Sequence, residues 1–346
     1  MSERIAVVLF NLGGPDSLDA VQPYLRNLFS DPAIIRLPGL LRLPLARLIA
    51  DRRAPYAREE IFAKIGGRSP IVPETQAQAD LLKTHLDVDT RIFIAMRYWQ
   101  PRAEGVAREI MGFAPERVVL LPLYPQFSTT TTESSFKEFE VELAKVGYRG
   151  KIERICCYPT APGFVAALTE TIIPKLTEAH VHGVPRLLFS AHGLPQSIVK
   201  AGDPYVWQVE QTARAVIDAL RTPLLDWSIC YQSRVGPLKW TGPSIDEEIA
   251  RAAADSRVIV VAPIAFVSEH SETLVELDMK YKKIAAEAGA PGYFRVPAVG
   301  VNRHFIAELA SLVREAAGHA KARAYCNPRL CPGAFNACPN GSTGSP

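Results

Sequence analysis

The amino-acid sequence predicts an α/β protein in which helices flank parallel sheets. Short β-branched runs alternate with longer amphipathic stretches along the whole chain, which is the pattern of strand, helix and parallel strand. Most of the short runs are apolar throughout, as expected of strands that helices cover on both faces. The alternation therefore predicts a doubly wound architecture.

Eight segments have the composition of buried strands, and three others have clear helical periodicity. The strands are expected at residues 5–10, 91–96, 117–123, 151–156, 186–190, 226–231, 257–263 and 292–296. The helices are expected at 204–220, with Asp203 as N-cap, at 268–288, ending at Gly289, and at 302–317, followed by Gly318. The runs at 117–122 and 257–263 resemble each other, which indicates two similar halves.

The length of 346 residues exceeds the size at which one hydrophobic core stops growing, so two lobes are expected. In the tail, Cys, Pro, Asn and Gly replace the periodic pattern, which is typical of a loop held by other groups or of disorder. The expected parts are an N-terminal lobe at 1–155, a C-terminal lobe at 156–301, a helix at 302–320 that packs back on the first lobe, and the tail at 321–346.

The composition favours a small-molecule or protein partner over a nucleic acid. The formal charge is only +3, and the basic residues are scattered among almost as many acidic ones. The first ten residues lack a small-residue cleavage site, so we expect a strand there rather than a signal peptide, and a cytoplasmic protein. No charge-free apolar run is long enough to span a membrane, but residues 34–50 mix Leu and Ile with Arg and Pro. That segment fits either contact with a membrane surface or a cap over a pocket.

Two predicted strands deliver polar residues to the edge of a sheet where ligands bind in open α/β folds. The strand at 186–190 leads to His192, and the strand at 257–263 leads to Glu269, Glu272 and Glu276. The spacing of three and four places these carboxylates on one helix face, although the helix dipole alone also favours acidic residues there. The combination is more informative, because an imidazole and a carboxylate at one edge can bind a divalent cation and accept protons.

Other strand ends resemble pocket linings. Two glycines follow Leu12 and permit close backbone approach to a ligand, although the third glycine of a dinucleotide fingerprint is absent. Arg97, Tyr98 and Trp99 end one strand, and Trp240 closes the segment after another. A flat apolar ligand could stack on these rings while arginine pairs with its carboxylates.

From the first strand to about residue 315 the chain resembles the ferrochelatases. Eight segments carry this resemblance in the right order, which makes it highly specific. They are NLGGP at 11–15, KIGGRSPI at 64–71, MRYW at 96–99, LPLYPQFSTTTT at 121–132, FSAHGLP at 189–195, GDPY at 202–205, YQSRVGPLKWTGPS at 231–244 and FVSEHSETLVELD at 266–278.

The resemblance implies two Rossmann-like lobes with a porphyrin in the cleft between them. It implies insertion of Fe²⁺ into protoporphyrin IX to give protohaem, the terminal step of haem biosynthesis, with no organic cofactor. His192 matches the family histidine at the pyrrole nitrogens, as metal ligand or proton acceptor, and Glu272 matches the carboxylate opposite or behind it. Glu269 and Glu276 continue an acidic line for protons or metal, with His270 beside them.

The family also implies residues that contact the porphyrin. Arg52 and Arg53 are candidates to pair with propionates. Lys280 stands where relatives often carry a further acid, so the acidic line is expected to end at Glu276. The residues expected to line the macrocycle are Leu12, Ser69, Arg97, Tyr98 and Trp240.

Cys326, Cys331 and Cys338 resemble the C-terminal extension with which some ferrochelatases hold a [2Fe–2S] cluster. Their spacing lacks the paired knuckles of a zinc ribbon, and a cluster needs a fourth thiolate from elsewhere. Cys157, or else its neighbour Cys156, is the expected fourth ligand; Cys230 is a poorer candidate because it lies inside a predicted strand. The alternative is three unliganded thiols on a frayed tail.

Two other functions compete with this interpretation. One is a related chelatase that acts on coproporphyrin or sirohydrochlorin, and the other is a haem or porphyrin carrier without enzymatic activity. A carrier needs axial ligation of the iron but no acidic line, so it predicts retention of haem without metal insertion. The sequence leaves the choice between protoporphyrin and coproporphyrin open, and also the oligomeric state.

Overall fold

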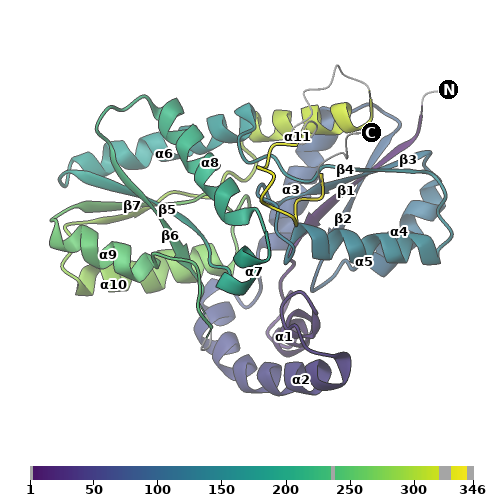
Figure 1. Ribbon diagram of the computed structural model, residues 1–346, viewed down its shortest axis with the longest axis horizontal. Helices are drawn as coiled ribbons and strands as arrows, with labels where there is room; N and C mark the ends of the chain where they lie inside the picture. The colour runs from purple at the N-terminus through teal and green to yellow at the C-terminus, as the bar shows by residue number, and fades with distance from the viewer. Residues whose placement is uncertain (1–2, 235–237, 319–328, 341–346) are drawn as a thin grey trace. The chain divides into compact units, whose positions relative to one another are not determined.

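The computed structural model describes residues 3–234, 238–318 and 329–340. The described residues divide into two compact units (Figure 1). The first unit contains residues 3–124, 128–156 and 310–318, and the second contains 125–127, 157–309 and 329–340. The lobe boundaries expected at 155, 301 and 320, and the packing of the last helix on the first lobe, stay predictions.

The first unit is built on a four-stranded parallel sheet with the order β2-β1-β3-β4. Its strands form where the sequence runs are apolar, and every residue of β1 is buried. Phe10 on β1 packs edge-to-face against Phe136 and Phe139 on α5 (Thr132–Lys145), which joins that helix to the sheet. The strands are β1 (Ile5–Asn11), β2 (Thr90–Met96), β3 (Arg117–Pro122) and β4 (Lys151–Arg154).

The helices of the first unit include a group inserted between β1 and α3, and three helices that alternate with the strands. An α-helical pair, α1 and α2, lies between β1 and α3, and the backbone after α2 continues as a π-helix and a short 3₁₀ turn. The helices are α1 (Val21–Ser30), α2 (Gly39–Tyr56), η1 (Ala57–Phe62), η2 (Ala63–Ile65), α3 (Ile71–Thr84), α4 (Ala103–Phe113) and α5 (Thr132–Lys145).

The second unit is built on another four-stranded parallel sheet, with the order β6-β5-β7-β8. Its strands are β5 (Pro185–His192), β6 (Asp226–Gln232), β7 (Val258–Pro263) and β8 (Tyr293–Arg295). Its helices are α6 (Pro162–His180), α7 (Gln196–Lys200), α8 (Tyr205–Leu220), α9 (Ile245–Ala254), η3 (Glu272–Tyr281) and α10 (Lys282–Glu287). The last helix, α11 (Arg303–Ala316), begins in the second unit and ends in the first.

The two sheets repeat one topology. In each, the first strand in the chain pairs with the second on one side and with the third on the other, and the fourth lies beyond the third. The strands β3 and β7, whose sequences resemble each other, occupy equivalent positions. In such sheets the strand order reverses between the first and third strands, and ligands bind at the carboxyl ends there. In the second unit this switch point lies between β5 and β7.

The structure confirms the predicted class and all eight predicted strands. The helices expected at 204–220 and 302–317 are α8 and α11, and Asp203 accepts a hydrogen bond from the backbone N–H of Tyr205 at the start of α8. The helix expected at 268–288 differs. It begins only at Glu272, and its first ten residues form a π-helix, with i→i+5 hydrogen bonds, before α10 continues.

Candidate active site

His192 is the last residue of β5 and stands at the switch point of the second sheet. Its Nδ1 lies 2.6 Å from the carbonyl oxygen of Gly193. A carbonyl only accepts hydrogen bonds, so Nδ1 carries the hydrogen and Nε2 of the neutral ring keeps its lone pair. The side chain is 37% exposed, and Nε2 lies 3.9 Å from Oε1 of Glu272. The arrangement therefore presents a basic nitrogen beside a carboxylate.

Glu272 lies between two imidazoles at the first position of η3. Its Oε1 faces His192, and its Oε2 lies 3.8 Å from Nε2 of His270, beyond normal hydrogen-bond length. Both Oε2 and that Nε2 are buried and lack a hydrogen-bond partner among the described residues. Unsatisfied buried polar atoms are rare in proteins, so the gap between them is suited to a proton, a water molecule or a cation.

The charges of this group shift one another's pKa. Burial raises the pKa of Glu272, but the nearby His192 and His270 outweigh it and hold the pKa below its usual value. Burial lowers the pKa of His270, but Glu272 outweighs that effect and raises it. A buried carboxylate and a buried imidazole thus favour each other's charged forms, as in groups that share protons.

Glu276 lies one turn further along η3 and is fixed by two side chains from the end of β6. Its Oε2 accepts from the hydroxyl of Ser233 at 2.7 Å and from Nε2 of Gln232 at 3.2 Å. Gln232 also donates to the backbone carbonyl of Glu272, and its own Oε1 accepts from Ser190. Burial, and next the charge of Glu272, raise the pKa of Glu276. Glu276 is therefore poised to hold a proton beside an ionised neighbour.

Glu269 does not share the helix face of the other two glutamates. The expectation of three carboxylates on one face is wrong for Glu269, because the helix begins at Glu272. Oε1 of Glu269 instead contacts Nη1 of Arg295 at 2.8 Å and accepts from the backbone N–H of Ala298 at 2.9 Å. The predicted role of Glu269 in a proton or metal path is untested, but its carboxylate already has a cationic partner.

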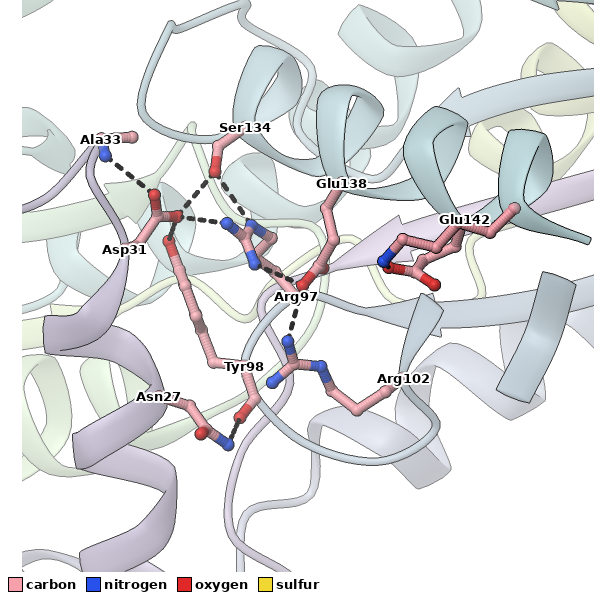
Figure 2. Close-up of polar contacts among 10 residues, drawn as sticks. Asn27, Asp31, Ala33, Arg97, Tyr98, Arg102, Ser134, Glu138 and Glu142 are labelled. Atoms are coloured by element: carbon pink, nitrogen blue, oxygen red, sulfur yellow. Dashed lines mark hydrogen bonds and ion pairs between the residues drawn. The ribbon is translucent and has the colours of Figure 1, made fainter. Parts of the chain in front are cut away.

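Arg97 and Tyr98, expected to contact a ligand, belong to a buried polar network in the first unit (Figure 2). Arg97 pairs with Asp31 at 2.8 Å and with Glu138 at 2.9 Å, and its Nε donates to Ser134. Tyr98 is only 1% exposed, and its hydroxyl donates to Asp31. Burial, and then the Asp31 charge, raise the pKa of Tyr98. The Arg97 cation is thus compensated by two carboxylates within its own unit.

Of the other predicted porphyrin contacts, Leu12 is joined to this network, because its backbone carbonyl accepts from the N–H of Tyr98 at 2.9 Å. Ser69 is buried beside Gly14, where a side chain would meet it at 2.5 Å, so the glycine permits this close approach. Arg52 and Arg53 are exposed on α2, and the Arg53 guanidinium lies 5.6 Å from the centre of the Phe29 ring. Leu12 after β1 and Trp240 after β6 are each partly buried. Their contact with a ligand stays a prediction.

A glutamine that the sequence did not reveal joins two of the predicted cluster cysteines. Gln208 on α8 is fully buried, and its Nε2 lies 3.3 Å from Sγ of Cys157 and 3.1 Å from Sγ of Cys331. Its Oε1 accepts from the backbone N–H of Phe127 at 2.7 Å, which fixes the amide so that its NH₂ group faces both sulfurs. Cys338 is buried, and Cys326 lies outside the described residues.

Within residues 3–234, 238–318 and 329–340, no three His, Cys, Asp or Glu side chains are grouped closely enough to hold a metal ion. The hydrogen bond with Cys338, followed by burial, raises the pKa of the Cys331 thiol. Ligation of a cluster by these cysteines is therefore a proposal.

The two repeated parallel sheets have the fold of known chelatases. Solved structures with a similar fold include SirB from Bacillus subtilis with Fe³⁺, with a TM-score of 0.55 at 12% identity over 93% of this chain and 98% of that one. Another is the sirohydrochlorin chelatase SirB from Bacillus subtilis subspecies spizizenii in complex with cobalt, with a TM-score of 0.51 at 13% identity over 73% and 91%. At these identities the likeness concerns the fold, which is that of the chelatases.

Sequence comparison then gives the particular family. The family profile of ferrochelatase matches residues 4–317. The ferrochelatase of Phenylobacterium zucineum (strain HLK1) is 52% identical over 98% of this chain and 99% of its own length. That of Pelagibacter ubique (strain HTCC1062) is 47% identical over 96% and 98%. The chain belongs to the ferrochelatase family, which confirms the resemblance found in the sequence.

Proposed function

We propose that the protein inserts Fe²⁺ into protoporphyrin IX to give protohaem, with His192 and Glu272 as its catalytic pair. The observation that carries this proposal is the separation of 3.9 Å between Nε2 of His192 and Oε1 of Glu272, at the switch point of a parallel sheet. The ring nitrogen that keeps its lone pair is the one that faces the carboxylate.

The reaction requires a base, and it involves no change of oxidation state. Two pyrrole N–H protons must leave the macrocycle as the cation enters, and the iron stays Fe²⁺ throughout. Nε2 of His192 accepts one proton, and the resulting imidazolium is stabilised by Glu272 beside it. Glu272 accepts the second proton or holds His192 in place, and both groups can also ligate the incoming iron.

A second set of side chains carries protons away from this pair. His270 lies 3.8 Å from Glu272 on the side opposite His192. Glu276 interacts with the charge of Glu272, and Gln232 fixes it by donating both to its carboxylate and to the backbone carbonyl of Glu272. The raised pKa of Glu276 makes its carboxylate a favourable acceptor for a proton that Glu272 has first taken from the macrocycle, so that Glu272 returns to its ionised form. Glu269 would join this path only by giving up its contact with Arg295.

We further propose that Cys157, Cys326, Cys331 and Cys338 hold a [2Fe–2S] cluster. The donor set is supported by the position of Cys157 and Cys331 on either side of the Gln208 amide, although these residues are 174 positions apart in the sequence. N–H donors to ligand sulfurs are a recurring feature of such sites. The same contact favours Cys157 over Cys156 as the fourth ligand. When bound, a cluster supplies a one-electron redox group and a cross-link between these segments.

The helix α2 is the proposed site of contact with a membrane surface. Leu40, Leu41 and Leu43 are exposed on α2, and so is Arg47. An interfacial helix needs apolar and basic side chains together. No helix in the described part of the chain is long and apolar enough to cross a bilayer. Co-sedimentation with anionic vesicles tests the proposal, and equal binding after Leu40→Ser with Leu41→Ser would contradict it.

The function is tested by incubating the purified protein with Fe²⁺ and each porphyrin under anaerobic conditions and following the absorption spectrum of the product. Conversion of protoporphyrin by the wild type, and its loss in His192→Ala, supports the proposal. Preferred conversion of coproporphyrin would reassign the substrate. Tight haem retention without metal insertion would identify a carrier instead.

A further inference from the structure

The proposed catalytic carboxylate and the neighbouring proton acceptor lie on an unusual backbone. Glu272 and Glu276 both belong to η3, a π-helix of ten residues. The π-helix is rare and occurs mostly as single turns, so a segment of this length needs contacts from outside the helix to keep it wound. On the site side these contacts come from Gln232 and Ser233.

The edge strand β8 holds the same helix through two other side chains. Tyr293 and Arg295 are two residues apart and so project from the same face of the strand. The Tyr293 hydroxyl donates to the backbone carbonyl of Leu277 at 2.7 Å, and Nε of Arg295 lies 2.7 Å from Oδ1 of Asp278. Consecutive residues of η3 are thus fixed to β8.

Arg295 also reaches the segment that leads into the helix. Its Nη1 contacts Oε1 of Glu269 at 2.8 Å, and Glu269 is itself fixed by the backbone N–H of Ala298. One guanidinium therefore joins a residue three positions before Glu272 to a residue six positions after it. Arg295 is 13% exposed, and the planar group suits two carboxylates at once.

We propose that Arg295 is a positioning residue for iron insertion, which keeps η3 in the register that directs Glu272 toward His192. The proposal rests on the catalytic role of Glu272 proposed above. If η3 rewound by one residue toward α-helical hydrogen bonding, its side chains would turn by about 100° around the helix axis. Glu272 would then leave its position beside Nε2 of His192. Glu269 acts in this arrangement as a partner of Arg295.

A second arginine of the same sheet serves as a matched control. Nε of Arg257, directly before β7, lies 3.4 Å from Oδ2 of Asp226. It resembles Arg295 in pairing with an aspartate, but it lies at the opposite end of the strands from His192. Arg257→Met therefore reports on the general loss of an ion pair in this sheet.

The test compares Arg295→Met, Arg295→Lys and Arg257→Met in anaerobic iron insertion, together with amide hydrogen exchange in the same proteins. In Arg295→Met we expect kcat to fall by about 10- to 100-fold, the loss that a misplaced catalytic group causes. The KM for porphyrin should stay within about threefold, because Arg295 contacts neither catalytic side chain. Arg295→Lys should be intermediate, since one ammonium group does not reproduce the two-armed contact.

Hydrogen exchange separates positioning from stability and does not depend on activity. In Arg295→Met, amides of residues 272–281 should exchange at least about tenfold faster, as local opening predicts, while those of β5 stay unchanged. A wild-type kcat in folded Arg295→Met, or unchanged exchange at 272–281, would overturn the proposal. If Arg295→Met does not fold, Asp278→Asn removes one of the two ion pairs of Arg295. Unchanged kcat and unchanged exchange in Asp278→Asn would also overturn the proposal. An inactive wild type would refute the function itself, while the exchange data would still test the contact.

Discussion

His192 and Glu272 are 80 residues apart in the sequence, but Nε2 of His192 lies 3.9 Å from Oε1 of Glu272. His192 ends β5, whereas Glu272 starts the helix that follows β7. Because β5 and β7 are adjacent and parallel, their carboxyl ends share one edge of the sheet. The pair is therefore a direct product of the strand order, and the following predictions depend on its surroundings.

Glu272→Gln should reduce kcat for iron insertion by about 100- to 10,000-fold, the range for loss of a proton-transfer group. The amide keeps the shape of the side chain but neither accepts the proton nor stabilises an imidazolium on His192. The rate is measured in single turnovers with Fe²⁺ and protoporphyrin. Glu287→Gln, on the exposed end of α10, is the control and should keep the wild-type rate. A fully active Glu272→Gln would exclude Glu272 from the catalytic pair.

Glu269→Gln should lower the free energy of unfolding by about 1–3 kcal/mol at pH 7, because the Arg295 guanidinium loses a buried charged partner. Burial raises the pKa of Glu269, but Arg295 outweighs it and the folded-state pKa is lowered. The ionised carboxylate therefore stabilises the fold above the unfolded pKa of about 4.3, and this stability is lost as the pH falls through the lower folded-state pKa. Urea unfolding should show a weaker acid dependence in the variant, and identical pH profiles would contradict the assignment.

Asp31→Asn should destabilise the first unit by about 2–4 kcal/mol, since it leaves Arg97 with a single carboxylate. The wild-type carboxylate also accepts hydrogen bonds from Tyr98 and Ser134. Thermal unfolding measures the effect. Asp80→Asn, an exposed change on α3, serves as control and should stay within about 0.5 kcal/mol of the wild type. Equal stability of both variants would show that the network contributes little.

Cys157→Ser should abolish the visible absorption and acid-labile sulfide of anaerobically purified protein, whereas Cys156→Ser should keep both. Gln208→Leu should retain the cluster but shift its reduction potential to more negative values, because two N–H···S contacts that stabilise the reduced form are lost. A colourless wild type would exclude the cluster. A coloured wild type with an unchanged potential in Gln208→Leu would exclude only the role of Gln208.

The strands and the closeness of His192 to Glu272 could be predicted from the sequence, because both depend on local patterns. An apolar run such as that of β1 has few alternatives to a buried strand, and a polar residue directly after such a run reaches the ligand edge. The π-helix could not be predicted, since the segment from Glu272 has the same apolar and acidic spacing as an α-helix. The contacts of this helix with side chains at the end of β6 and on β8 are equally invisible in the local pattern.

The supporting polar residues were missed for a different reason. Asp31, Gln208 and Arg295 are each defined by partners far away in the sequence, and no local motif marks them. Tyr98 is an example, because the MRYW segment marks its position at a strand end but nothing in that segment indicates its burial against Asp31. Long-range hydrogen bonds decide whether such a side chain faces a ligand or the interior.

The shared strand order of the two sheets gives each position in one a counterpart in the other. Asn11 ends β1 opposite Met96, as His192 ends β5 opposite Gln232. Asn11 is buried and bonds to Thr75, so the same scaffold position holds a buried amide in one half and a partly exposed imidazole in the other. The end of the first strand of each sheet therefore accepts either side chain without any change in strand order.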